Sequence, residues 1–234
     1  MRASVWAVGT ILLALSIFPA FPIVSAAMES AAFQAAIDAE VRQNSPNTNF
    51  GSDSPMRIGT QTDVRRVFIQ FDLSSVESGS GIISATLSLR AVSCTSSGVR
   101  TFNVHTVAAS WVEASVTWNT QPATVGSPVQ KVVDTGILCP VQDTFDVTEF
   151  VQAWVDAEIV NNGMRLSDSN EATGALLRGW VSRDGPSQNP HLDVVWRTSP
   201  LAGVDLTALL MLIAFIVILV AAAVFVFVIS GRIG

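Results

Sequence analysis

Tryptophan is the residue type in this sequence whose side chain is best suited to hold a ligand. Five tryptophans lie between the two apolar ends of the chain, at positions 111, 118, 154, 180 and 196. An indole offers a large flat apolar surface with one polar edge, and a sugar ring can stack on such a surface. Trp180 falls in phase with Arg178 rather than with Leu177 and Val181, so an exposed ring beside a guanidinium is expected. Trp180 and Arg178 are therefore the predicted ligand-binding residues.

The other tryptophans are expected to serve mainly the core. Trp154 lies on the apolar stripe of a predicted helix, and Trp196 falls in phase with the apolar residues of the last predicted strand. Along an unbroken strand Trp111 and Trp118 would face opposite ways, so at most one of them is expected to be exposed.

Titratable side chains form no recognisable catalytic motif in the sequence. His105 and His191 do not stand in a metal-ligand spacing, and His105 is interpreted as a surface or rim residue of a strand. The sequence holds no G-x-S-x-G nucleophile motif and no Gly-rich phosphate loop. The acids that could pair for glycoside hydrolysis are Asp143, Asp146, Asp168 and Asp184. We expect a protein that is not an enzyme and has no cofactor.

Calcium is the metal that loop carboxylates of an all-β domain would bind. The loop acids available for it are Asp53, Asp63, Asp168 and Glu171. Their spacing matches no known calcium loop, so no metal site is assigned.

Alternating apolar and polar residues, interrupted by turn formers, predict that β-strands position these side chains. Strands are expected at 35–42, 64–73, 83–91, 102–106, 129–133, 163–166, 176–182 and 191–196. In the first of them, Ala39 and Val41 share one face while Asp38 and Glu40 share the other. A short helix follows Asp146, which fits a capping box with Glu149. This pattern predicts an all-β fold, a two-sheet antiparallel jelly-roll sandwich with one short helix.

Cys94 and Cys139 are the only cysteines, and both lie in the part of the chain expected to be exported. An even number of cysteines in an oxidising compartment predicts a structural disulfide between them.

Both ends of the chain carry apolar segments. Residues 208–229 contain no polar or charged side chain, and a helix of that length crosses the hydrocarbon layer of a membrane. Residues 1–27 have a basic start, an apolar run and small residues at the end, as in a secretory signal peptide. An uncleaved N-terminal anchor and a removable lipid-anchor signal at the C-terminus stay open as alternatives.

These segments predict a single-pass protein of the cell membrane with its N-terminal domain outside. The expected parts are a signal peptide (1–27), an exported domain (28–199), a short linker (200–206), a transmembrane helix (207–229) and a cytoplasmic tail (230–234). Of the 13 basic side chains, only Arg2 and Arg232 lie in the terminal segments, whereas all 19 acids lie between them. The exported part is therefore acidic, which argues against nucleic acid as a partner.

Seven segments in order resemble the DNRLRE domain family, and together they span nearly the whole of residues 35–196. The segments are VRQNSPNTNFGSDSPMRIG (41–59), RRVFIQFDLSS (65–75), ISATLSLR (83–90), ASWVEASVTWNTQPA (109–123), FDVTEFVQAWV (145–155), NNGMRLS (161–167) and WVSRDGPSQNPHLDVVW (180–196). The most specific is the W-x-E-x-x-V-T-W-N-x-x-P pattern at 111–122. This sequence departs from the family in having no tyrosine, with Trp196 where a closing tyrosine is common, and in its cysteine pair.

The resemblance implies a secreted or surface-attached jelly-roll module, of a family also classed among carbohydrate-binding modules as family 96. The catalysis of the archaeal disaggregatases that also give the family its name is not carried over. The expected function is non-catalytic binding of extracellular or cell-wall polysaccharide. A structural or adhesive module that binds other cell-surface proteins stays open as the alternative.

Overall fold

The computed structural model describes residues 26–59, 63–95, 98–134, 138–171, 177–198 and 206–230. Nearly all of the predicted signal peptide, linker and cytoplasmic tail lies outside these residues. Those assignments stay predictions.

Ten strands and two helices make up the described part of the chain, and every strand pairing in it is antiparallel. The elements are β1 (Met28–Arg42), β2 (Met56–Gly59), β3 (Arg65–Phe71), β4 (Gly81–Thr95), β5 (Val99–Val107), β6 (Thr124–Asp134), β7 (Val141–Asp146), α2 (Thr148–Val155), β8 (Met164–Asp168), β9 (Leu177–Trp180), β10 (His191–Arg197) and α3 (Leu206–Ser230). The sequence patterns missed β2 and β7, which are short, and the first half of β1, Met28–Gln34.

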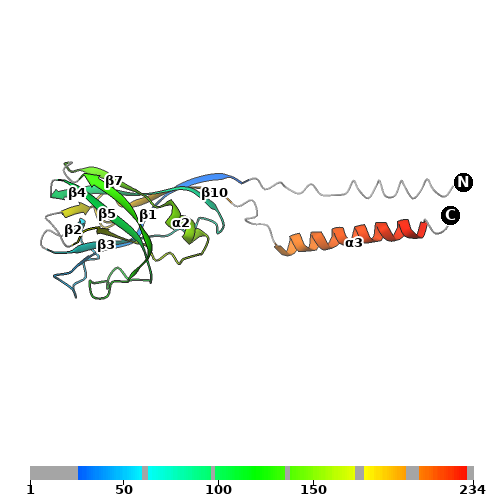
Figure 1. Ribbon diagram of the computed structural model, residues 1–234, viewed down its shortest axis with the longest axis horizontal. Coiled ribbons are helices and arrows are strands. Elements are labelled where there is room, and N and C mark those ends of the chain that lie inside the picture. The colour runs from blue at the N-terminus through cyan, green and yellow to red at the C-terminus, as the bar shows by residue number, and fades with distance from the viewer. Residues whose placement is uncertain are drawn as a thin grey trace.

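β1 joins the two layers of the sandwich. Its first half pairs with β10 and its second half with β3, and the register shifts between Ala35 and Ile37, where the strand changes partner. β10, β4 and β7 form one layer, and β3, β8, β5 and β6 form the other, while β9 and β2 connect them. Figure 1 shows the strands gathered at one end of the molecule and α3 extending away from them. The predicted all-β sandwich is confirmed.

The core between the layers follows the predicted alternation with one exception. Val67, Ile69 and Phe71 are buried, as are Leu87 and the other apolar residues of β4 from Ala85 to Ala91. Ile83, expected on the same face, is 48% exposed. The register of β4 and β10 shifts there, so that Ile82 pairs with Trp196 and packs against the core instead. A bulge moves every later side chain to the opposite face.

The second half of β1 departs further from the expected pattern, because both of its faces are buried. Ala39 and Val41 pack against Phe68 in a second apolar cluster, which is separate from the core between the layers. Asp38 and Glu40, on the other face, are 1% and 0% exposed. Asp38 and Glu40 therefore share a face as predicted, and that face is enclosed by the protein.

α2 lies where the sequence predicts a helix, but its capping differs. Val151, Trp154 and Val155 form the buried stripe. Asp146 accepts hydrogen bonds from the backbone N–H and the hydroxyl of Thr148 (3.1 and 2.6 Å), while Val147 occupies the N-cap position. No bond from Glu149 back to Asp146 is found among the described residues, so the predicted capping box is wrong in its reciprocal half.

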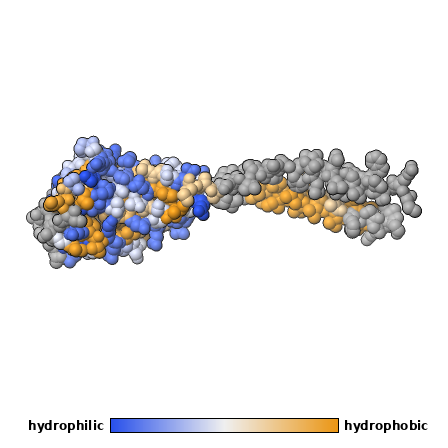
Figure 2. All heavy atoms as spheres, turned by 90° about the horizontal axis from the view of Figure 1, so that it is seen from above, coloured by the Kyte–Doolittle hydropathy of each residue, from blue (hydrophilic) through white to orange (hydrophobic). Residues whose placement is uncertain are grey.

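α3 has the length and composition of a membrane-spanning helix. Residues Leu209–Val226 have a mean hydropathy of 3.3, and none of them is buried against the described part of the protein. Figure 2 shows its apolar side chains as a continuous surface, in contrast to the mixed surface of the sandwich. An uncovered apolar helix of this kind fits a single-pass anchor.

The predicted disulfide between Cys94 and Cys139 is confirmed. It links the end of β4 to the segment just before β7, and the two cysteines are 45 residues apart in the sequence. In the chain-entropy model a loop of this size stabilises the fold by about 4 kcal/mol, because it restricts the unfolded chain.

Reducing this disulfide should lower the free energy of unfolding by about 4 kcal/mol, again from the loop-entropy model. Urea titrations of the chain in detergent micelles, followed by tryptophan fluorescence with and without dithiothreitol, measure the difference. A variant with both cysteines changed to serine serves as the control, since dithiothreitol should not shift its transition. Equal midpoints for the oxidised and reduced chain would contradict a stabilising role.

Candidate functional site

The two residues predicted to bind a ligand lie inside the protein. Trp180 is 0% and Arg178 is 1% exposed, so the expectation of an exposed pair is wrong. The Trp180 ring meets Phe102 and Phe145 edge-on, at centroid distances of 5.9 and 6.5 Å. β9 pairs with β4 along one edge and with β2 along the other, at a place where the strand is enclosed on both faces. The prediction assumed that the charged Arg178 lies on an exposed face, and in the structure this face is buried.

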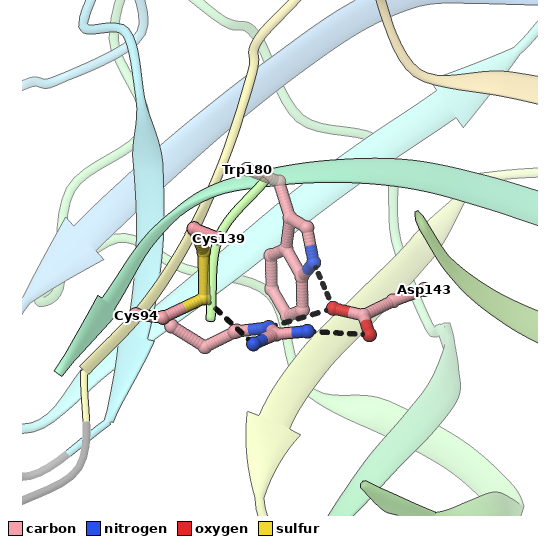
Figure 3. Close-up of a disulfide and its surroundings, with 5 residues drawn as sticks. Cys94, Cys139, Asp143 and Trp180 are labelled. Carbon is pink, nitrogen blue, oxygen red and sulfur yellow. Dashed lines mark hydrogen bonds and ion pairs between the residues drawn. A yellow bond between two sulfur atoms is a disulfide. The ribbon is translucent and has the colours of Figure 1, made fainter. Parts of the chain in front are cut away.

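Asp143 explains how a guanidinium can be buried there. It accepts two hydrogen bonds from Arg178 and one from the Trp180 indole N–H, at 2.7–2.8 Å (Figure 3). The remaining Arg178 nitrogen, Nη1, donates to the sulfur of Cys94. The charge is therefore matched and the polar atoms of the pair are satisfied, which is the condition for burying an ion pair. In this arrangement Arg178 and Trp180 belong to the buried core, and their predicted contact with a ligand stays a prediction.

Replacing Asp143 with alanine should destabilise the fold by about 3–5 kcal/mol, because Arg178 would be left as an uncompensated buried charge. Chemical denaturation of the purified chain measures the loss. The matched control is Asp72→Ala, which removes an exposed carboxylate. If both variants unfolded at the same denaturant concentration, the buried ion pair would be of little energetic importance.

Trp118 is the tryptophan that the fold leaves accessible. It is half-buried, whereas the other four in the sandwich are at most 9% exposed. Trp118 and Trp111 belong to the segment between β5 and β6, residues 108–123, which is not a strand. Trp111 faces inward against Phe68 at a centroid distance of 5.7 Å, and its indole N–H donates to the carbonyl of Asn162. The prediction that at most one of the two is exposed agrees with this arrangement.

Arg66 of β3 anchors Trp118. Its guanidinium lies 4.4 Å from the centre of the indole ring, in cation–π geometry. The same guanidinium makes a two-pronged ion pair with Glu171, with both bonds at 2.7 Å, and donates to the Gln121 side chain. An indole held by a fixed guanidinium is a rigid platform, which lowers the entropy lost when a ligand stacks on it.

A second guanidinium lies beside the first. Arg165 of β8 is opposite Phe68 of β3 and His105 of β5, on the same outward face as Arg66. It makes no ion pair with a described residue, and its buried Nε has no hydrogen-bond partner among them. Burial, and then the charge of Arg66, lowers the pKa of Arg165, while Glu171 opposes that shift.

His105 completes this polar face. Burial lowers the pKa of its imidazole first, followed by the neighbouring Arg165, against a hydrogen bond with Gly126. The ring is therefore neutral at pH 7, and it can accept or donate hydrogen bonds there. We call the half-buried residues Arg66, His105, Trp118, Gln121, Arg165 and Glu171 the Trp118 face. It combines an aromatic platform with several polar groups, as sites for polar ligands do.

Hydrogen bonds to residues distant in sequence fix the segment 108–123, which carries Trp118. The Asn49 amide donates to the carbonyls of Glu113 and Val116 (2.7 and 2.8 Å), and the backbone N–H of Asn119 donates to Pro46. Gly51 allows this close approach, because a Cβ at that position would lie 2.3 Å from the Glu113 carbonyl oxygen. The Trp118 platform thus rests on contacts that are distant in sequence.

A model of carbohydrate-binding module family 96 matches residues 29–195. The chain belongs to this family. A search of the curated proteins finds no match to this chain. The family-96 resemblance inferred from the sequence is therefore confirmed, while membership of the DNRLRE family stays a prediction.

The family-96 module also has an apolar cleft of about 570 Å³ next to α2. Its lining includes Phe71, Leu73, Val76 and Trp154, whose indole N–H has no partner in the described residues. Trp154 is only 8% exposed, so little of its ring is available for a sugar to stack on. The Trp118 face has the better geometry for a carbohydrate.

The acids considered for hydrolysis are occupied elsewhere. Asp168 pairs with Arg100, Asp143 with Arg178, and Asp146 with Thr148. The acids considered for calcium are likewise bonded to arginines: Asp53 to Arg42, Asp63 to Arg65 and Glu171 to Arg66. Of these candidates only Asp184 is left, and it lies beside two carboxylates that the sequence did not single out, Asp38 and Glu113.

Proposed function

We propose that this family-96 module binds an acidic extracellular polysaccharide on the Trp118 face, without cleaving it, and that α3 holds it at the membrane. The supporting observation is the half-buried indole of Trp118, which is fixed by the guanidinium of Arg66, and the charge of Arg165 close to Arg66. A sugar ring stacks on the indole, and its carboxylate or sulfate group pairs with the guanidinium of Arg165. Guanidinium groups are suited to such two-pronged contacts with carboxylates.

The net negative charge of the domain should make the binding of a polyanion selective for the Trp118 face. The exported part is acidic, so a polyanion is repelled from most of the surface and attracted only where guanidinium groups gather. On this proposal, binding of an acidic polysaccharide weakens as salt is added, and a neutral polysaccharide of similar length binds less tightly.

Trp118→Ala should weaken binding of the acidic polysaccharide at least tenfold, because the stacking surface is lost. Affinity electrophoresis and calorimetry with a panel of acidic and neutral polysaccharides measure the change. Trp118→Phe serves as the matched variant and should retain part of the affinity. The proposal is wrong if a folded Trp118→Ala chain binds as tightly as the parent, or if the parent binds no polysaccharide.

Arg165→Gln should lower the affinity for the acidic polysaccharide by about tenfold, or 1.4 kcal/mol, and leave that for neutral polysaccharides nearly unchanged. Arg197→Gln removes the same charge from an exposed position on β10 and should have no effect. A similar loss in both variants would show that only the net charge matters. Release of reducing ends from any bound polysaccharide would contradict the non-catalytic part of the proposal.

A further inference from the structure

Three carboxylates from distant parts of the chain meet beside β1. Asp38 belongs to β1, Glu113 to the segment 108–123, and Asp184 to the loop between β9 and β10. One oxygen of each lies within 4.8 Å of one oxygen of the other two. Three like charges at such separations repel one another unless something between them is positive.

Hydrogen bonds account for only part of this cluster. Asp38 Oδ2 accepts from the backbone N–H of Arg183 at 2.7 Å, and Glu113 accepts from the N–H of Asp38 and from the Arg183 guanidinium. Asp38 Oδ1 is buried and has no hydrogen-bond partner in the part of the chain that is described, although Asp38 is only 1% exposed. A buried carboxylate oxygen without a partner is costly, and such oxygens mark places where a proton, a water or an ion belongs.

The charge balance favours an ion. Among the described contacts the only guanidinium that pairs with this group is that of Arg183, and it pairs with Glu113 alone, so the three carboxylates and Arg183 together are about two charges negative when fully ionised. The bare cluster is thus electrostatically unfavourable when fully ionised, and a divalent cation would offset its charge.

We propose that Asp38, Glu113 and Asp184 bind a divalent cation, and that calcium fits the site best. All three side chains offer only oxygen, which excludes the nitrogen and sulfur donors that zinc prefers. Calcium takes six to eight oxygen ligands and accepts irregular geometry, so water can complete a site with three carboxylates. Asp184 is exposed, and it leaves an open side through which the ion and its water enter.

The loop that carries Asp184 contains two further side-chain oxygens without partners. Ser182 Oγ and Asn189 Oδ1 are buried and have no hydrogen-bond partner among the described residues. The amide nitrogen of Asn189 donates to the carbonyl of Arg183 at 2.6 Å, so this side chain folds back over the loop. The loop between β9 and β10 therefore contains two buried side-chain oxygens that no hydrogen bond among the described residues satisfies.

The cation would strengthen the connection among three elements that hydrogen bonds and one ion pair already join. A cation shared by β1, the segment 108–123 and the loop after β9 binds the folded chain and not the unfolded one. Calcium should therefore raise the melting temperature in a concentration-dependent manner. This expectation is independent of polysaccharide binding, because both measurements below are made without any ligand but the metal.

The test uses the full chain in non-ionic detergent micelles, stripped of metal with a chelator. Calorimetric titration with CaCl₂ should show one saturable site, and tryptophan-monitored melting should shift upward with calcium and return with EDTA. Asp184→Asn should weaken calcium affinity at least tenfold, whereas Glu77→Gln, which neutralises an exposed carboxylate elsewhere, should leave it unchanged. Asp184 is exposed, so its variant is expected to fold.

Two results would overturn the proposal of a cation site, and a third would reject calcium as its ion. The first is a folded parent chain with no saturable calcium binding and no calcium-dependent melting. The second is equal calcium affinity in the Asp184→Asn variant and the parent, which would place the ion elsewhere. Tighter binding of Mg²⁺ than of Ca²⁺ would reject calcium as the fitting ion.

Discussion

The burial of both faces of β1 beyond Ile37 is the constraint on which the rest of the module depends. The strand passes from one layer to the other and then has Ala39 and Val41 covered by the second apolar cluster. With that cover in place, Asp38 and Glu40 on the opposite face cannot reach bulk water. Each buried carboxylate must then be compensated by the protein, because an unmatched one would cost several kcal/mol.

The two carboxylates are compensated in different ways. Glu40 has three arginines around it, Arg42, Arg57 and Arg65, and it also accepts the backbone N–H of Arg57 at 2.8 Å. Asp38 has one backbone N–H and two other carboxylates. Asp38 therefore has an excess of negative charge around it, whereas Glu40 does not, and the proposed cation site lies at Asp38. The hydrogen bond from the N–H of Asp38 to Glu113 also holds the segment 108–123 in place.

Local sequence patterns predicted the parts of the fold that depend on periodicity alone. The alternation in β3, β4 and β10, the apolar stripe of α2 and the long apolar α3 all follow from neighbours in the sequence. The pattern failed at Ile83, where a register shift between two strands changes the face. Register shifts depend on the partner strand, and a single strand's sequence does not record them.

The exposure of Trp180 and Arg178 was mispredicted for a related reason. Periodicity shows that Trp180 and Arg178 share a face, but whether that face is exposed depends on Asp143, which lies on a different strand. A charged residue indicates exposure only when no opposite charge is buried with it. Trp118 stands beside no alternating pattern, because it lies in a segment without a strand, and its exposure follows from how Glu113 and Asn49 fix that segment. The platform for a ligand and the carboxylates of the proposed cation site are thus positioned by one set of long-range contacts. A change in the ion site should therefore be felt at Trp118 through the backbone between residues 113 and 118, without any direct contact between the two.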